Sequence, residues 1–431
     1  MLELLVNRDR LLRFIKEGGW IVVGQIAAMA GSLFLVRVLT SYLDPVQYGQ
    51  LALGLTVAGL VQQVVMGGIS NGIGRFYSIA VEKNDLSGYL YASLRLMGYA
   101  SVAVAAIAAT LTGGLLWLGY SQWIGLAAAA LLLSLFTGYN AALNNMQNAA
   151  RQRSVVALHG GLNALLKILL AVGVMLFWLG KTSTAVVIGY ALSLFLVTGS
   201  QLFFARRLIR QARGSKIASV SVNWGQQMRQ FSWPFMVWGV FTWLQMSSDR
   251  WALQHFVSTE DVGRYAVLFQ LGYTPINLIT GMMITFLAPI LYQRSGSATD
   301  PARNRAVHRI SWRIASAGLF MTSIGFILTL LLHKPIFHVL AADYQAVSYL
   351  LPWMVLAGGV FAAGQMLSLK LMSEIKSTAL LASKIGTAVL GVGLNIYGAA
   401  QFGLQGVVAA LVLFSFSYLI WMAWLARYTH R

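Results

Sequence analysis

Long apolar runs separated by short polar segments dominate this chain. Each run holds roughly 20 residues with few charges, which is the length at which an α-helix crosses a bilayer. The longest connection, residues 206–230, is too short to form a water-soluble domain. We therefore predict an all-α polytopic membrane protein with about 12 transmembrane helices, near residues 18–40, 49–73, 91–118, 123–147, 155–179, 183–205, 231–256, 263–291, 310–332, 346–370, 378–400 and 404–426.

Composition narrows the possible functions. Of the 431 residues 58% are hydrophobic and 10% are charged, against about 25% charged residues in a soluble domain. This composition excludes an ordinary soluble enzyme. The chain has no cysteine, which excludes disulfides and thiolate chemistry. It contains no P-loop motif and no His, Asp or Glu cluster with metal-ligand spacing, so we predict neither ATP hydrolysis nor a metal site nor a catalytic site.

The charges predict the topology. Lys and Arg number 31 and Asp and Glu 12, which gives a net charge of +19. If the N-terminus is cytoplasmic, 24 of the 31 cations fall in cytoplasmic segments, and the outside loops hold only Lys181, Arg264 and Lys334. By the positive-inside rule, both termini are then cytoplasmic. Residues 1–17 mix leucines with arginines, as a basic amphipathic segment on the membrane surface does.

The two halves of the chain resemble each other weakly. Arg37 and the stretch that follows it resemble Arg250 and its following stretch, and Gly49 and Gly263 open the next span in each half. Six spans per half give both halves the same orientation, an arrangement typical of secondary transporters. We predict an N-lobe at 18–205, a basic cytoplasmic linker at 206–230 and a C-lobe at 231–431, around a central cavity.

Lys167 is the first candidate for binding. An ionisable group in a span costs about 2.5–3.5 kcal/mol on insertion scales and is a functional candidate by default. Lys167 lies in the middle of its span, and His159 and Asn163 precede it at intervals of four residues, so the three share one helix face. We predict that this face lines a cavity and contacts substrate; the alternative is a structural lysine between helices.

Four further ionisable residues lie in spans. Asp249 and Arg250 are sequence neighbours whose side chains should point about 100° apart, so we expect Asp249 to pair with a cation of another helix or to bind a coupling proton or Na⁺. Arg250 is a second candidate for substrate contact. Arg37 and Lys384 lie nearer the ends of their spans, where contact with substrate and snorkelling to the interface explain them equally well.

Uncharged polar residues also recur within the spans. Asn140, Asn144 and Asn148 form another stripe at intervals of four. Each amide can simply bond a neighbouring helix, but together the polar residues suggest a hydrated interior.

The predicted membrane part carries a surplus of three positive charges, from four cations and Asp249. In a medium of low dielectric constant, such a surplus attracts anions and repels cations. An anionic lipid headgroup, such as a pyrophosphate-linked sugar, would supply the missing charge.

Three stretches carry a resemblance to a known family. Residues 37–52 (RVLTSYLDPVQYGQLA) resemble the first outside turn of polysaccharide biosynthesis flippases, which belong to the multidrug/oligosaccharidyl-lipid/polysaccharide exporter superfamily. Residues 248–250 with 260–265 resemble the second-lobe counterpart, and residues 403–407 resemble a Gly-x-x-Gly turn before the last span. The resemblance implies two six-helix lobes around a central, often cationic cavity. It also implies transfer of undecaprenyl-pyrophosphate-linked oligosaccharide repeat units across the bacterial cytoplasmic (inner) membrane, for lipopolysaccharide, capsule or exopolysaccharide synthesis.

The expected partners follow. They are the lipid-linked oligosaccharide, anionic membrane lipids at the basic cytoplasmic loops, and the polysaccharide polymerase and glycosyltransferases of the same pathway, but no nucleic acid. No cofactor is expected, and transport would draw on a proton or sodium gradient or on the membrane potential. Two alternatives stay open: a cation-coupled multidrug exporter, which needs acidic cavity residues such as Asp249, and a membrane-embedded polymerase or glycosyltransferase, which needs a long outside loop.

Overall fold

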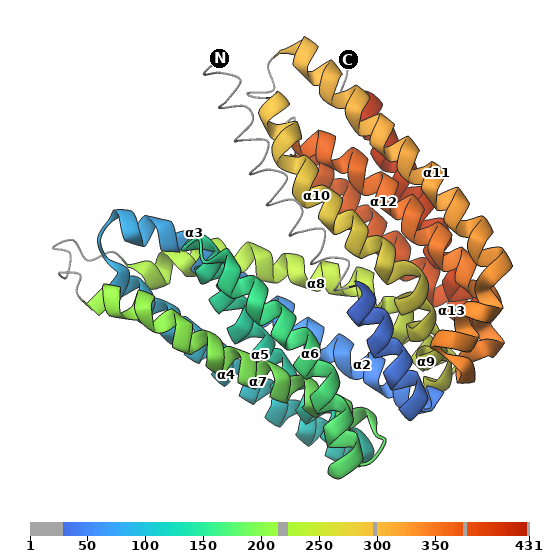
Figure 1. Ribbon diagram of the computed structural model, residues 1–431, viewed down its shortest axis with the longest axis horizontal. Coiled ribbons are helices and arrows are strands. Elements are labelled where there is room, and N and C mark those ends of the chain that lie inside the picture. The colour runs from blue at the N-terminus through green and yellow to red at the C-terminus, as the bar shows by residue number, and fades with distance from the viewer. Residues whose placement is uncertain (1–28, 214–222, 296–299, 374–376, 429–431) are drawn as a thin grey trace. The chain divides into compact units, whose positions relative to one another are not determined.

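A computed structural model describes residues 29–213, 223–295, 300–373 and 377–428 of the chain (Figure 1). Within these ranges every regular element is a helix, which confirms the all-α prediction. The predicted amphipathic segment 1–17 lies outside the described residues.

Nine described segments are long and apolar enough to cross a membrane, so the chain is a multi-pass membrane protein. The shorter apolar helix Met29–Tyr42 precedes them. The number of twelve spans stays a prediction. In the apolar stretches of Leu86–Trp117 and Ala302–Leu340 only 11% of residues are buried, as expected of helices that face lipid.

By contacts between Cα atoms, the chain forms two compact units, residues 47–247 and residues 1–46 with 248–431. The lobes predicted from the repeat, 18–205 and 231–431, stay a prediction. Helices enter both ends of the predicted linker: α7 (Ser183–Arg213) continues into it and α8 (Trp224–Phe256) begins within it. Arg, Leu, Gln and Ala are good helix formers, which favours continuation of α7, and Asn223 Oδ1 caps α8 by accepting from Gln226 N at 3.1 Å.

The unit of residues 47–247 is a bundle of helices around one apolar core. Its core includes Met66, Tyr89, Leu131, Trp224 and Met228. A π-helical segment interrupts the second span. The elements are α2 (Pro45–Val61), η1 (Gln62–Gly67), α3 (Gly68–Glu82), α4 (Leu86–Trp117), η2 (Ser121–Trp123), α5 (Ile124–Ala149), α6 (Arg153–Phe177), α7 and most of α8.

A buried tryptophan fixes the start of α8 in this unit. Trp224 Nε1 donates to Asp85 Oδ2 at 2.7 Å, and Asp85 Oδ1 caps α4 by accepting from Gly88 N at 3.0 Å. The Trp224 ring also meets those of Tyr89 and Phe76 edge to face. One carboxylate therefore joins the α3–α4 connection, the start of α4 and the start of α8.

The second unit contains the helix Met29–Tyr42 and the later part of the chain. Leu291, Val307, Leu367 and Met422 belong to its core. The elements are the end of α8, α9 (Thr259–Leu268), η3 (Phe269–Tyr273), α10 (Thr274–Ser295), α11 (Pro301–Leu340), η4 (Ala342–Leu350), α12 (Leu351–Ser373) and α13 (Ser377–Tyr428). α13 joins two helices at Gly403, whose φ of 59° favours glycine, and this break separates the predicted spans 378–400 and 404–426.

Two backbone carbonyls tie the first helix to this unit. Thr40 Oγ1 donates to Leu340 O at 3.0 Å, and Tyr344 OH donates to Leu43 O at 3.1 Å. The end of the Met29–Tyr42 helix is therefore held against the end of α11.

Lys370 differs from its expected place. It ends the predicted span 346–370 and was counted among the 24 cytoplasmic cations, but it lies within α12, is fully buried and donates from Nζ to Ala426 O at 2.7 Å. A lysine stem is long and apolar enough to cross the packed interior, and its amine satisfies a carbonyl in the last turn of α13.

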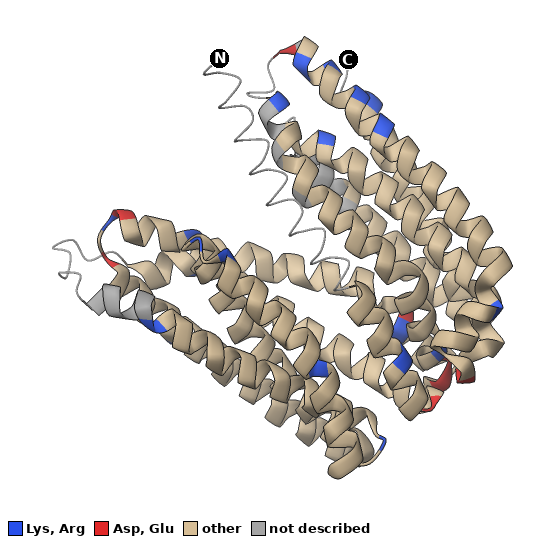
Figure 2. Ribbon diagram, in the orientation of Figure 1, with Lys and Arg blue, Asp and Glu red and all other residues tan. Residues whose placement is uncertain are grey.

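The charges of this unit are distributed unevenly between its ends, with arginines and Asp300 at one end and acids together with Arg264 and Lys334 at the other (Figure 2). Arginines mark the start of α11 and the end of α13, whereas Glu260, Asp261 and Asp343 lie at the start of α9 and in η4. This separation is what the positive-inside rule expects, and the side on which each end lies stays a prediction.

Candidate functional site

The polar stripe of α6 faces α7 within the unit of residues 47–247. His159 Nε2 lies 3.1 Å from Ser200 Oγ, and Asn163 Oδ1 accepts from Ser193 Oγ at 2.8 Å. One turn further, Lys167 Nζ lies over the ring of Tyr190, 4.1 Å from its centroid. The three residues share one face, as their spacing requires, and that face is directed at a neighbouring helix.

Lys167 is half-buried. Its amine gains a cation–π attraction of about 0.5–2 kcal/mol from Tyr190. Within the described residues, no carboxylate lies within ion-pairing distance of Lys167. The aromatic ring stabilises the ammonium form of Lys167 without neutralising it. Tyr190 could not be predicted from the sequence, because it lies on a different helix and carries no spacing signal linked to Lys167.

An amide network lies between α5 and α7 of the same unit. Asn140 Nδ2 donates to Gln201 Oε1 at 2.8 Å, and Gln201 Nε2 donates to Asn144 Oδ1 at 2.7 Å and to Gln147 Oε1 at 3.2 Å. Gln147 and Gln201 are fully buried, whereas Asn148 is exposed. For Asn140 and Asn144, the helix-bonding interpretation therefore holds. Gln201 could not be predicted from the sequence, because its partners lie on another helix.

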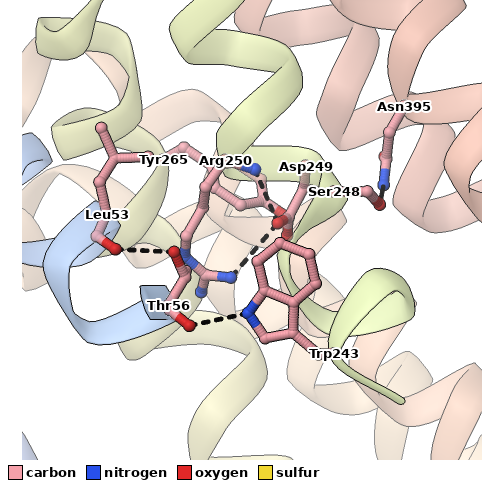
Figure 3. Close-up of polar contacts among 8 residues, drawn as sticks. All are labelled: Leu53, Thr56, Trp243, Ser248, Asp249, Arg250, Tyr265 and Asn395. Carbon is pink, nitrogen blue, oxygen red and sulfur yellow. Dashed lines mark hydrogen bonds and ion pairs between the residues drawn. The ribbon is translucent and has the colours of Figure 1, made fainter. Parts of the chain in front are cut away.

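A second charged cluster lies where α8 enters the other unit (Figure 3). Asp249 Oδ1 lies 3.3 Å from Arg250 Nη1 and accepts from Arg250 N at 2.7 Å, and Asp249 Oδ2 accepts from Tyr265 OH at 2.7 Å. The expectation that these neighbours do not pair was wrong. A short aspartate can fold back onto the next residue's backbone N–H, and the long Arg250 side chain can then reach around the helix to the same oxygen.

The cluster is completed by rings and an amide. The Arg250 guanidinium lies 4.8 Å from the ring centroid of Phe269 and 5.8 Å from that of Tyr265. Asn395 Nδ2 donates to Ser248 Oγ at 2.9 Å, which joins α13 to α8. Sequence analysis identified Asp249 and Arg250 but missed Tyr265, whose hydroxyl provides the second oxygen contact.

The pairing changes the charge of the predicted binding site. With side-chain exposures of 14% for Arg250 and 5% for Asp249, the two charges compensate each other away from water. Arg250 therefore contributes little to the attraction of an anionic substrate, because Asp249 compensates its charge. Asp249, in turn, is paired with Arg250.

The remaining candidates are not brought together. Arg37 is exposed on the helix Met29–Tyr42, which is compatible with snorkelling. The side chain of Lys384 lies outside the described residues. No group of three or more His, Asp or Glu residues that could hold a metal ion occurs in the part of the chain that the structure describes.

A backbone contact in the unit of residues 47–247 also appears in Figure 3. Trp243 Nε1 donates to Thr56 O at 2.7 Å, and Thr56 Oγ1 donates to Leu53 O at 2.7 Å. This indole bond fixes α8 to α2 near the π-helical segment Gln62–Gly67.

Comparison with known proteins gives a family and a fold. A sequence model of the family described as "Polysaccharide biosynthesis protein" matches residues 14–294. No curated protein matches the chain significantly. Among solved structures, the lipid II flippase MurJ in an inward closed conformation superposes with a TM-score of 0.71 at 11% identity, over 95% of this chain and 87% of that one.

Multidrug transporters share the fold as well. An inward-facing MATE transporter of the MOP superfamily gives a TM-score of 0.64 at 17% identity, over 94% of each chain. An outward-facing one gives 0.57 at 17% identity, over 95% of each chain. These similar structures are a flippase and transporters, not enzymes.

Proposed function

The chain belongs to the polysaccharide biosynthesis protein family, and from this premise we propose that it is a flippase for undecaprenyl-pyrophosphate-linked oligosaccharide repeat units. It moves them across the bacterial cytoplasmic membrane for the synthesis of O-antigen, capsule or exopolysaccharide. The family match and the similarity of the fold to that of a lipid II flippase support this proposal.

The proposal of a pyrophosphate-linked substrate rests on Lys167. It is a half-buried ammonium near the middle of α6, held over Tyr190, and no carboxylate among the described residues pairs with it. A pyrophosphate would supply the missing negative charge, and a charge-assisted contact to phosphate is stronger than a neutral hydrogen bond. Asn163 and His159 lie one and two turns before Lys167 on the same face of α6.

Transport proceeds by alternating access. The fold is shared with transporters solved in inward-facing and outward-facing conformations, which supports two states of the same chain. The pyrophosphate and sugars enter from the cytoplasmic side, where both termini lie, and the polyprenyl tail stays in lipid. A proton or sodium gradient or the membrane potential drives the cycle, and the glycosyltransferases and polymerase of the pathway act before and after it.

The multidrug-exporter alternative is less favoured. A cation-coupled exporter needs an acidic group free to bind a proton, Na⁺ or a cationic drug. Asp249 is the acid that sequence analysis offered for this role, and Arg250 and Tyr265 occupy its carboxylate.

Substitution of Lys167 tests the proposal. In a strain that lacks its own flippase for this pathway, Lys167→Ala and Lys167→Gln should abolish surface polysaccharide while the protein still reaches the membrane, and Lys167→Arg should retain part of the activity. Surface polysaccharide is measured by immunoblot and membrane protein by quantitative blot. Lys181→Ala, in the exposed loop between α6 and α7, is the matched control and should complement fully.

Full complementation by Lys167→Gln would contradict the proposed role of Lys167. Loss of activity with Lys167→Arg and Lys167→Gln alike, together with loss of the folded protein, would instead support the structural lysine.

A further inference from the structure

The first turns of α11 carry an arginine stripe that the proposed transport site does not use. Arg305, Arg309 and Arg313 follow one another at intervals of four residues, and all three are exposed. A helix advances about 6 Å over four residues, so the three guanidinium groups leave one helix face one turn apart. Blue bands recur along this part of α11 in Figure 2.

This stripe lacks compensation by acidic residues. α11 contains no Asp or Glu, and its described ion pair joins Arg303 to Asp300 at 3.5 Å. Within the described residues, no carboxylate pairs with Arg305, Arg309 or Arg313. Like charges at intervals of four destabilise a helix, so an external anion would relieve a repulsion that the described residues leave in place.

The stripe lines a hollow on the surface of α11. The hollow has a volume of about 570 Å³ and is lined by Arg305, His308, Arg309, Trp312, Arg313 and Ser316. The guanidinium of Arg427, at the end of α13, lies 5.3 Å from the centroid of the Trp312 ring. An indole beside several arginines is typical of the headgroup level of a membrane, where tryptophan is enriched.

The corresponding helix of the other half carries a related hollow. Gly49 and Gly263 occupy equivalent positions in the two halves. With the same sequence offset, Tyr91, Arg95 and Tyr99 of α4 are equivalent to Arg305, Arg309 and Arg313 of α11. These residues line a hollow of about 410 Å³ together with the start of α8, and Arg95 Nε donates to Tyr99 OH at 2.7 Å. Both helices bury only 11% of their apolar stretch, as expected of helices that face lipid along that stretch.

We propose that the α11 hollow binds the phosphodiester headgroup of an anionic phospholipid in the leaflet that the arginines face. Three features carry the inference: guanidinium forks match phosphate oxygens bidentately, the helix faces lipid, and the stripe has no carboxylate partner in the described residues. The site lies on the outer face of α11 and is distinct from Lys167. It does not depend on which substrate the protein transports.

The test measures lipid binding by purified full-length protein in detergent. Phosphatidylglycerol, phosphatidylcholine and inorganic phosphate are titrated separately, and bound lipid is counted by native mass spectrometry. The wild-type protein should retain phosphatidylglycerol in preference to phosphatidylcholine, and inorganic phosphate should not displace it. In R305Q/R309Q/R313Q, affinity for phosphatidylglycerol should fall by about 100-fold, since each cation near an anionic headgroup contributes about a fivefold factor.

A matched control removes the same charge elsewhere. R151Q/R153Q/R206Q loses three arginines that do not line the α11 hollow and should change the affinity by less than about threefold, since three specific contacts, not total charge, hold the headgroup. R305K/R309K/R313K keeps the charge but loses the bidentate guanidinium forks, so it should bind between the wild type and the glutamine variant. This partial recovery separates lost contacts from a misfolded variant.

Three results would overturn the proposal. Equal losses in the triple glutamine variant and the matched control would mean that only total charge matters. Equal retention of phosphatidylcholine would mean that the negative headgroup is not recognised, and displacement of phosphatidylglycerol by stoichiometric undecaprenyl pyrophosphate would mean that the hollow is part of the substrate path. Failure of the Lys167 test alone would leave this site unaffected.

Discussion

Arg250→Met gives a direct measure of how the charged cluster of α8 is held together. The substitution keeps a long apolar side chain but removes the guanidinium that lies 3.3 Å from Asp249. Asp249 is 4% exposed, so its carboxylate would be left buried with only Tyr265 OH and a backbone N–H as partners. Breaking a buried ion pair in this way costs about 3–5 kcal/mol, and we expect the free energy of unfolding to fall by that amount.

The double variant D249N/R250M should be much less affected. It removes both charges, and the amide oxygen introduced at position 249 would still accept from Tyr265. Replacing a buried ion pair by uncharged groups is often nearly neutral, so the double variant should unfold within about 1.5 kcal/mol of wild type. The double-mutant cycle should therefore give a coupling energy of at least about 2 kcal/mol.

The measurement is tryptophan-monitored unfolding by SDS in mixed micelles, with Arg264→Met as control. Arg264 pairs with Glu260 and Asp261, but these side chains are 44% and 19% exposed, so its loss should cost less than about 1 kcal/mol. If Arg250→Met were as mild as Arg264→Met, or if the two substitutions at 249 and 250 were additive, the cluster would not be a buried ion pair. A double variant that is stable but inactive in transport would show that the Asp249–Arg250 pair has a functional role as well.

Two further predictions concern packing in the unit of residues 47–247. A Cβ at Gly189 would lie 2.5 Å from Ala171 Cα, so Gly189→Ala should lower the free energy of unfolding by about 1–3 kcal/mol in the same SDS assay. Gly199→Ala, on the same helix, is the control. A Cβ there meets nothing within 4 Å, so this variant should be neutral or slightly stabilising. Trp224→Phe removes the indole bond to Asp85; it should cost about 1.5–3 kcal/mol, and an unchanged thermal unfolding midpoint would contradict the anchoring role of this residue.

Parts of the candidate site could be predicted because they depend on spacing along one helix. His159, Asn163 and Lys167 share a face for reasons of helix geometry alone, and the structure has them facing α7. Asn140 and Asn144 were found in the same way. The partner of Lys167, Tyr190, and the partner of the two asparagines, Gln201, were not predicted, because no spacing rule connects residues on different helices.

The pairing of Asp249 with Arg250 was predicted wrongly for a related reason. The helical angle between adjacent residues describes where the Cβ atoms point, not where a long guanidinium can reach. Tyr265, Phe269 and burial fix the rotamers, and these come from α9 and η3. Lys370 is similar: it was expected at the cytoplasmic end of the predicted span 346–370, and only the packing of α12 against α13 makes it a buried donor.

By itself, the sequence determined that this is an all-α membrane protein, because apolar runs long enough to span a bilayer leave no other regular structure for the backbone hydrogen bonds. It also determined the uneven distribution of charge and the family resemblance. Only the tertiary structure decided which charges are compensated: Arg250 by Asp249, but neither Lys167 nor the α11 stripe by a carboxylate of the described residues. Compensation depends on distances of a few ångströms between side chains of different elements, which a linear pattern does not contain.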